Sequence, residues 1–384
     1  MAWRHLLYHR GQSAILIACL TIPIILLLAT QLLAERYEDG LRARAANTPQ
    51  LVGAKGSRFG LVLAALHFRE VPLEMFPFAE CERIADGGEG LAIPLHLRFQ
   101  ARGRPIVGTS PEYFERRDLS IATGRAATKL GECVLGAEVA SAFDLGAGDH
   151  LFSDQLELYD ISKPPALKMR IVGVLAPCKT PDDGAVFVDV KTAWVLEGLA
   201  HGHDDVTEGN IDPALILAQN ESHIAVSAAL MEYSEVTPEG LASFHFHRPI
   251  DELPLSAVLF FPKNPKAATL VGSRTNRSLG LQMIAPNRIV DELLAFVFRI
   301  ERAIETLLAV LGIGTLGLLA LVLTLSTRLR EREMRALIRI GAAPSVSLRL
   351  HALEFAFVLI VSLAIAGIAM LCLAHWMPDP VALI

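Results

Sequence analysis

The sequence predicts an α-helical membrane protein with about three transmembrane helices and a large extracytoplasmic α+β domain. Three uncharged apolar runs carry the membrane prediction: Ser13–Leu33, Thr306–Thr327 and Phe355–Ala374. At about 1.5 Å per helical residue, each run is long enough to cross a hydrocarbon core of about 30 Å. The region between the first two runs contains no such run and is large enough to bury a core of its own. The chain of 384 residues is 52 % hydrophobic, which fits this mixture.

Charge is distributed unevenly along the chain. The first ten residues carry Arg4 and Arg10 and no acidic residue, and the segment between the second and third runs carries six arginines. These are Arg328, Arg330, Arg332, Arg335, Arg339 and Arg349. By the positive-inside rule, both short segments lie in the cytoplasm. Eight of the 35 basic residues and four of the 41 acidic residues lie outside the large region, which therefore holds 27 bases and 37 acids. An acidic domain argues against a nucleic-acid partner.

These observations divide the chain into seven segments. The predicted order is a cytoplasmic N-terminus (1–12), transmembrane helix 1 (13–34), an extracytoplasmic α+β domain with helical stalks (35–303), transmembrane helix 2 (304–327), a cytoplasmic coupling segment (328–352), transmembrane helix 3 (353–375) and an extracytoplasmic tail (376–384). The first run is longer than the apolar part of a signal peptide and lacks a clean cleavage site, so we interpret it as an uncleaved span. The predicted location is the cell (inner) membrane, multi-pass, with a cytoplasmic N-terminus.

Short runs typical of strands alternate with turn residues in the large region. The clearest are LAIPLHLRF, RPIVGTS, CVLGAEVA, HLFSD, LKMRIVGVL, GAVFVDV and PLSAVLFFP. Helical patterns such as GAEVASAFDLG lie among them, which indicates an α+β domain. The stretch NRIVDELLAFVFRIERAIETLL predicts one long helix that continues into the second apolar run. The glycines of LVGAKGSRFG could belong to a phosphate-binding loop or to a tight turn. The chain contains no Walker A pattern, so we predict a tight turn before a short apolar helix.

Four clusters contain residue types that can carry chemistry. They are His201 with His203, His245 with His247, Cys178 beside Lys179, and Asp182 beside Asp183. The histidines are metal-ligand types, but no third ligand follows from the spacing, so solvated histidines are favoured. The cysteine has no histidine partner, and the two aspartates suit a turn better than an acid–base pair. The sequence therefore predicts no enzyme active site, no metal and no bound cofactor.

The five cysteines show no metal-binding spacing, and Cys19 and Cys372 lie inside predicted spans. A disulfide between Cys133 and either Cys81 or Cys178 stays open in an extracytoplasmic domain. Free buried thiols are the preferred interpretation.

The segment between the second and third spans is the most distinctive feature. Glu331 and Arg335 form an i, i+4 pair, apolar residues alternate with the arginines, and Pro344 follows Gly341 at a helix break. An amphipathic basic helix suits a protein partner, and it suits anchoring to anionic lipid headgroups equally well. Physical reasoning alone leaves both alternatives open.

A resemblance favours the protein partner. A span, then RLREREMRALIRIGAA, then a glutamate that opens the next span resembles the FtsX/MacB-like permease family of ABC transporters. The matching positions are Arg330, Glu331, Glu333, Arg335, Ala336, Leu337, Ile340, Gly341, Ala342 and Glu354. LVGAKGS with LVLAAL, GECVLGAEVASAFDLGAGD, and MRIVGVLAP with KTPDDGAVFVDVKTAW resemble the MacB-type periplasmic core domain. Two features differ from the family pattern. The family usually has four spans, whereas three are predicted here, and Cys178 stands where relatives commonly have threonine.

The resemblance implies a permease subunit rather than an enzyme. A separate cytoplasmic ABC ATPase dimer would bind ATP, dock on the coupling positions and drive the spans by mechanotransmission, for export or for extraction of lipoprotein or lipid. The implied partners also include a second copy of the permease, an extracytoplasmic adaptor and membrane lipid. One alternative is a non-transport signalling or cell-division protein of the FtsX type that activates an envelope hydrolase. The other is a membrane-anchored binding or enzyme domain without an ATPase.

Overall fold

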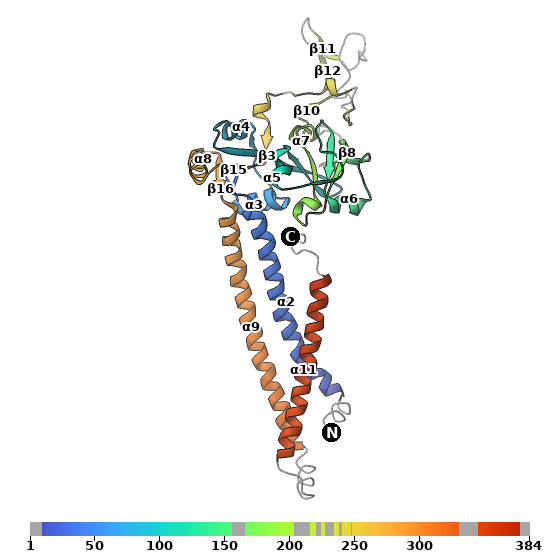
Figure 1. The fold of residues 1–384 in the computed structure, drawn as a ribbon, viewed down its shortest axis with the longest axis vertical. Coiled ribbons are helices and arrows are strands. Elements are labelled where there is room, and N and C mark those ends of the chain that lie inside the picture. The colour runs from blue at the N-terminus through green and yellow to red at the C-terminus, as the bar shows by residue number, and fades with distance from the viewer. Residues whose placement is uncertain are drawn as a thin grey trace. The chain divides into compact units, whose positions relative to one another are not determined.

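The computed structural model describes residues 10–155, 166–202, 216–219, 224–226, 234–237, 240–246, 248–329 and 345–376. These residues form two compact units, and Figure 1 labels many of their elements. Unit 1 comprises Met1–Leu41 with Asp291–Ile384, and unit 2 comprises Arg42–Val290.

Unit 1 is built from three long helices. They are α2 (Arg10–Ala46), α9 (Pro286–Leu329) and α11 (Ser345–Trp376), and α2 and α9 continue at one end into unit 2. Three stretches of them are long and apolar enough to span a membrane: Ala14–Ala46, Pro286–Val322 and Phe355–Trp376. Each overlaps one of the predicted apolar runs, so the predicted fold class is confirmed. The long helix expected before the second run is also confirmed as α9.

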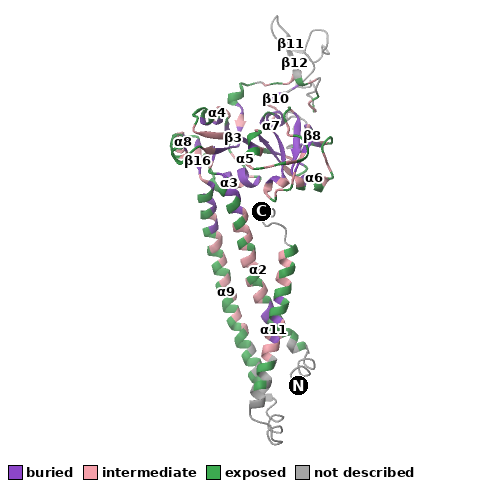
Figure 2. Ribbon diagram, viewed as in Figure 1, coloured by how far each residue is buried: buried purple, intermediate pink, exposed green. Residues whose placement is uncertain are grey.

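Within unit 1, α2 packs against α11 through a small apolar cluster. Leu20 and Val358 are buried there, and the Ser362 hydroxyl donates to the Ile17 carbonyl oxygen at 3.4 Å. The most apolar stretch of α9 contains no buried residue, and Figure 2 shows this helix largely green. Such an apolar, exposed surface is suited to a lipid environment.

Unit 2 is organised around a ten-stranded mixed sheet with the order β16-β1-β15-β3-β4-β9-β6-β8-β5, in which β7 also pairs with β8. The strands are β1 (Gln50–Ala54), β3 (Gly90–Ala101), β4 (Arg104–Thr109), β5 (Ile121–Gly124), β6 (Glu132–Leu135), β7 (His150–Phe152), β8 (Lys168–Leu175), β9 (Val186–Asp189), β15 (Ala257–Pro262) and β16 (Leu281–Ile284). The β4–β9 and β6–β8 pairs are parallel, and the other pairs are antiparallel. Three smaller pairs join β2 (Phe76–Pro77) to β14 (Pro254–Leu255), β10 (Ala200–His201) to β13 (His245–Phe246), and β11 (Ile216–Gln219) to β12 (Ile224–Val226).

Short helices cover this sheet. They are α3 (Arg58–His67), α4 (Ala79–Asp86), α5 (Glu112–Arg116), α6 (Ala137–Phe143), α7 (Val190–Leu196) and α8 (Pro265–Arg277). Helix α7 packs on β3, β4 and β9, and it places the fully buried Trp194 in one of two apolar clusters. The indole Nε1 of Trp194 donates to the Pro254 carbonyl oxygen at 2.8 Å, so its polar atom is satisfied. Figure 2 shows the buried residues of unit 2 concentrated in the sheet.

One element differs from the sequence prediction. The residues before Gly56 were expected to belong to a turn, but β1 is a strand that pairs with both β15 and β16. Gly53 lies within this strand, and its lack of a side chain allows close packing, because a Cβ there would come within 2.5 Å of the Leu61 side chain. The turn itself follows at 55–57, where the Ser57 hydroxyl caps α3 by accepting the Gly60 N–H at 3.0 Å.

Candidate functional site

The predicted coupling positions fall largely outside the described residues. These are Arg330, Glu331, Glu333, Arg335, Ala336, Leu337, Ile340, Gly341 and Ala342. Glu354 lies on α11, but its side chain is likewise outside the described set, whereas Arg349 is exposed on the same helix. The coupling role of these positions therefore stays a prediction.

The histidine clusters give no metal centre in the described residues. His203, His247 and the side chain of His201 lie outside them, and His245 is exposed with Nδ1 2.9 Å from the Ser243 carbonyl oxygen. Among the described residues, no three His, Cys, Asp or Glu side chains come together as metal ligands. All five cysteines are free thiols.

The turn that contains Cys178 has a structural role in the described residues. Asp183 accepts hydrogen bonds from the backbone N–H groups of Cys178 and Lys179, as the turn interpretation expected. Burial raises the pKa of the Cys178 thiol above its ordinary value, which is opposite to the shift of an activated nucleophile. Asp182 behaves differently from its neighbour, because it is fully buried.

Asp182 is the centre of a buried polar network at the end of α2. Its carboxylate pairs with Arg44, which lies in the last turn of α2, and Arg44 Nη2 donates to Asp182 Oδ1 at 2.8 Å. The Tyr113 hydroxyl of α5 donates to the same oxygen at 2.7 Å, and the Thr180 hydroxyl donates to Oδ2 at 2.6 Å. Asp182 lies in the 3-10 helix η1 (Pro181–Gly184), so the network joins three separate segments of unit 2.

The network extends to Arg117 and the end of α3. Arg44 Nε donates to the Leu66 carbonyl oxygen at 3.1 Å, and Arg117 Nη2 donates to the Thr48 hydroxyl at 2.7 Å. Arg44 is only 6 % exposed, so nearly all of this charge is removed from water. We call the group Arg44, Thr48, His67, Tyr113, Arg117 and Asp182 the α2 joint.

Electrostatics keep the joint charged at neutral pH. Burial acts to raise the pKa of Asp182, but the Arg44 charge and the hydrogen bonds outweigh it, so the pKa lies below its ordinary value. Burial raises the pKa of Tyr113, so its phenol keeps its proton and donates to the carboxylate. The result is a buried carboxylate that is paired and hydrogen-bonded. The joint is therefore suited to holding the end of α2.

Sequence reasoning missed the joint. Arg44 stands in a polar stretch that reads as a solvated helix end, and Asp182 stands in a turn 138 positions away. The one local signal is Arg44 itself, which lies one helical turn after Leu41, a residue that the structure shows to be fully buried.

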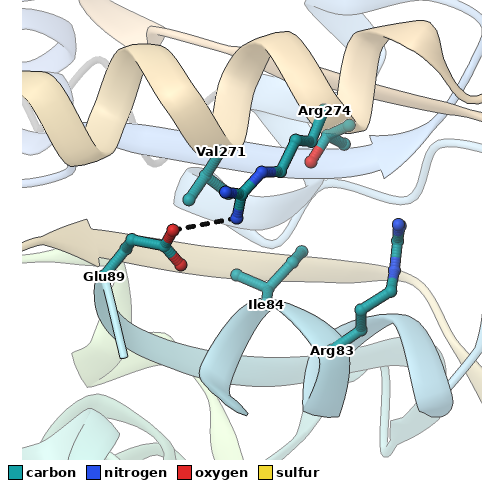
Figure 3. Close-up of a pocket in the computed structure, with 6 residues that line it drawn as sticks. Arg83, Ile84, Glu89, Val271 and Arg274 are labelled. Carbon is teal, nitrogen blue, oxygen red and sulfur yellow. Dashed lines mark hydrogen bonds and ion pairs between the residues drawn. The ribbon is translucent and has the colours of Figure 1, made fainter. Parts of the chain in front are cut away.

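A small pocket lies between α4 and α8, and Figure 3 shows its lining. Its volume is about 180 Å³, and it is lined by Arg83, Ile84, Glu89, Val271, Arg274 and Thr275. Arg274 Nη1 donates to Glu89 Oε1 at 2.8 Å across the pocket. Ligand pockets usually measure about 300–1,000 Å³, so this pocket is small for a transported solute.

Comparison with known proteins gives a family match within unit 2. Residues 52–232, slightly under half of the chain, match the family described as the MacB-like periplasmic core domain. Comparison with curated proteins finds no significant relative. Among solved structures, the periplasmic region of MacB from Actinobacillus actinomycetemcomitans is 8 % identical, with 66 % of this chain and 97 % of that chain covered and a TM-score of 0.38.

The extracellular domain of the noncanonic ABC-type transporter YknZ from Gram-positive bacteria is 9 % identical, with 61 % of this chain and 98 % of that chain covered and a TM-score of 0.33. Because both TM-scores are low, the assignment depends on the family match and on the three candidate spans. The predicted resemblance is confirmed. Residues 52–232 match the MacB-like periplasmic core domain family, and the chain is similar in this way to the FtsX/MacB-like permeases of ABC transporters.

Proposed function

We propose that the chain is the permease subunit of an ABC transporter that works by mechanotransmission. A separate cytoplasmic ATPase dimer binds ATP and docks on residues 328–352, and its hydrolysis cycle moves the spans. The continuity of α2 is the observation that carries the proposal: one helix contains the first candidate span and ends in the α2 joint. A helix fastened by buried hydrogen bonds transmits displacement to the domain, because that end cannot slide without breaking them.

The hydroxyl groups of the spans support movement over solute passage. Thr21 Oγ1 donates to the Ile17 carbonyl oxygen at 2.7 Å, and Thr315 Oγ1 donates to the Gly312 carbonyl oxygen at 2.8 Å. Thr324 Oγ1 donates to the Leu321 carbonyl oxygen at 2.8 Å. The protons of these three hydroxyls are used inside their own helices rather than offered to a solute, which supports the proposal.

The remaining assignments follow from the same proposal. The protein lies in the cell membrane with its N-terminus and 328–352 in the cytoplasm, and the MacB-like domain lies outside. A second copy of the chain completes the permease, lipid surrounds the exposed surface of α9, and an extracytoplasmic adaptor binds the domain. The cargo is exported or is a lipoprotein or lipid that the domain extracts.

Copurification of the ATPase tests the proposal. Tagged full-length protein, solubilised from its own cells, should retain an ATP-binding protein with a Walker A motif and show ATPase activity in nanodiscs. Glu333→Arg should abolish both, because a mispaired charge at an interface costs a few kcal/mol, whereas a lipid anchor would tolerate an added base. Gly341→Val should act likewise if the backbone must turn there.

A matched control makes the same charge change elsewhere. Glu112→Arg, on the exposed start of α5, should leave copurification intact. Full activity in Glu333→Arg would assign the segment to lipid anchoring. Loss of an envelope hydrolase activity on deletion, with efflux unchanged, would assign the chain to the FtsX-type signalling alternative.

A further inference from the structure

His67 is an exception to the hydrogen bonding of buried polar groups. It is the last residue of α3, it is 7 % exposed, and neither Nδ1 nor Nε2 has a hydrogen-bond partner among the described residues. Buried polar atoms are nearly always paired, so each unpaired one calls for a physical reason. A neutral imidazole with two unsatisfied nitrogens is a group that gains by reaching water.

The surroundings of His67 are cationic. Arg44 acts on it from the last turn of α2, Arg69 from the residues after α3, and Arg117 from the residue after α5. Asp182 is the carboxylate that acts on it, and it is already paired with Arg44 and hydrogen-bonded to the Tyr113 phenol. A proton on His67 would therefore add positive charge to a buried group in which Asp182 already balances the charge of Arg44.

Burial, and then the charges of Arg44, Arg69 and Arg117, lower the pKa of His67 from 6.5 to about 4. When the end of α3 opens and the ring reaches water, the pKa returns toward 6.5. The open form therefore binds the proton more tightly, and acid favours opening. Asp182 does not titrate in this range, because its pKa is lowered from an ordinary value of 3.8.

The end of α3 is coupled to Arg44 through the adjacent residue. The Leu66 carbonyl oxygen accepts from Arg44 Nε, so a displacement that exposes His67 also removes an acceptor from the joint. Phe68, the residue that follows His67, has a left-handed backbone conformation with φ 54°. That conformation is strained for a bulky side chain, so opening at this point relieves a local cost.

We propose that His67 makes the α2 joint acid-sensitive: protonation of its ring opens the end of α3 and releases Arg44 from Leu66. The device regulates how firmly the last turn of α2 is held. It does not depend on the proposed transport function, since the opening is a property of unit 2 by itself. In a working permease, acid outside the cell would loosen the transmission of movement into the domain.

Hydrogen exchange on the full chain in nanodiscs tests the proposal. Peptides that cover residues 42–48 and 62–69 are followed between pH 7.5 and pH 5.0, after correction for the intrinsic exchange rate. With pKa values of 6.5 open and about 4 closed, the opening equilibrium should rise about 25-fold over this range. Peptides at the start of α9, which includes the buried Ile289 and Val290, should not follow this rise.

Variants assign the effect to the ring. His67→Phe keeps an aromatic ring but takes no proton, so protection should become independent of pH. His67→Gln takes no proton either and is the variant to use if the larger phenyl ring does not fit. His150→Phe, which removes a partly exposed histidine from β7, should keep the wild-type response. Unchanged wild-type protection down to pH 5.0 overturns the proposal, whether or not the variants fold. A full pH response in either folded His67 variant overturns it as well.

Discussion

Arg44 and Asp182 meet through two guanidinium nitrogens, with Arg44 Nη2 2.8 Å from Asp182 Oδ1 and Nη1 paired with Oδ2. The pair is buried on both sides, at 6 % and 0 % exposure. A paired fork of this kind is directional, so it fixes the rotation of the last turn of α2 as well as its position. Removal of either partner leaves the other charge in a dry environment.

Replacement of Arg44 by methionine should therefore destabilise unit 2 by about 3–5 kcal/mol, because Asp182 loses its counter-charge. The double variant Arg44→Met with Asp182→Leu should recover part of this loss. Urea unfolding of the full chain in detergent, followed by tryptophan fluorescence, to which the buried Trp194 contributes, measures both. Arg83→Met is the control, since its pair with Glu80 is largely exposed and should matter little. Equal losses in the Arg44 and Arg83 variants would contradict a structural role for the joint.

Gly136→Ala should destabilise the domain through the same region. A Cβ at Gly136 would lie 2.3 Å from the Asp182 carbonyl oxygen and 2.4 Å from that of Asp183, so η1 must shift. Overpacking of this kind typically costs about 1–3 kcal/mol. Gly184→Ala is the matched control, because its nearest neighbour is 3.6 Å away. In thermal unfolding, Gly184→Ala should have the midpoint of the wild type and Gly136→Ala a lower one. A wild-type midpoint for Gly136→Ala would show that η1 shifts at little cost.

Glu132 should contribute stability that acid removes. Its carboxylate pairs with Arg125 and accepts the Thr128 and Lys129 N–H groups at 3.1 and 3.2 Å. The Arg125 hydrogen bond first, then the backbone bonds, lower the pKa from 4.5 to about 2 against the effect of burial. Because the folded form holds the proton less tightly, the contribution is complete above about pH 4.5 and disappears toward pH 2.

Glu132→Gln should accordingly lower the urea midpoint at pH 7 and flatten its decline between pH 4.5 and pH 2.5. The control is Glu138→Gln, which removes a carboxylate that pairs with Arg104 and is more exposed than that of Glu132. Its urea midpoint should fall with pH as that of the wild type does. Parallel curves for Glu132→Gln and the wild type would show that the pair adds nothing. This window lies below that of His67, so the two effects separate on the pH axis.

Topology is tested by reporters fused at two positions. A periplasm-active enzyme fused after Ile384 should be active, and the same enzyme inserted after Ala343 should be inactive, because the arginine-rich segment stays inside. A fluorescent protein that folds only in the cytoplasm should give the opposite pattern. Cytoplasmic activity at Ile384 would mean that the number of spans is wrong.

The membrane helices and most strands could be predicted because their signals are local. An uncharged run of the right length is sufficient for a span, and β8 and β9 have short apolar runs beside turn residues. The strand β1 could not be predicted in this way. Its glycine suggested a turn, and its two partners lie more than two hundred residues later in the chain.

The α2 joint was beyond local patterns for the same reason. An arginine in a polar stretch is usually solvated, and only the folded domain removes Arg44 from water and brings Asp182 to it. His67 gave no signal either, since an isolated histidine at the end of an apolar helix resembles an ordinary cap. The coupling positions at 330–342 show the opposite case: a pattern predicts their role, and their placement lies outside the described residues.

The position of β1 between β15 and β16 has a consequence for biogenesis. The first strand of the domain to be synthesised is completed by the last two, so one edge of the sheet stays unfinished until residue 284 has been delivered. Pairing across such a sequence separation is slow, and an apolar strand waits unpaired meanwhile. If the domain is translocated while it is synthesised, as the proposed topology requires, the nascent chain would need a holding chaperone for that interval. A chain terminated before Leu281 would be a target for envelope proteases even though most of its sheet had been made.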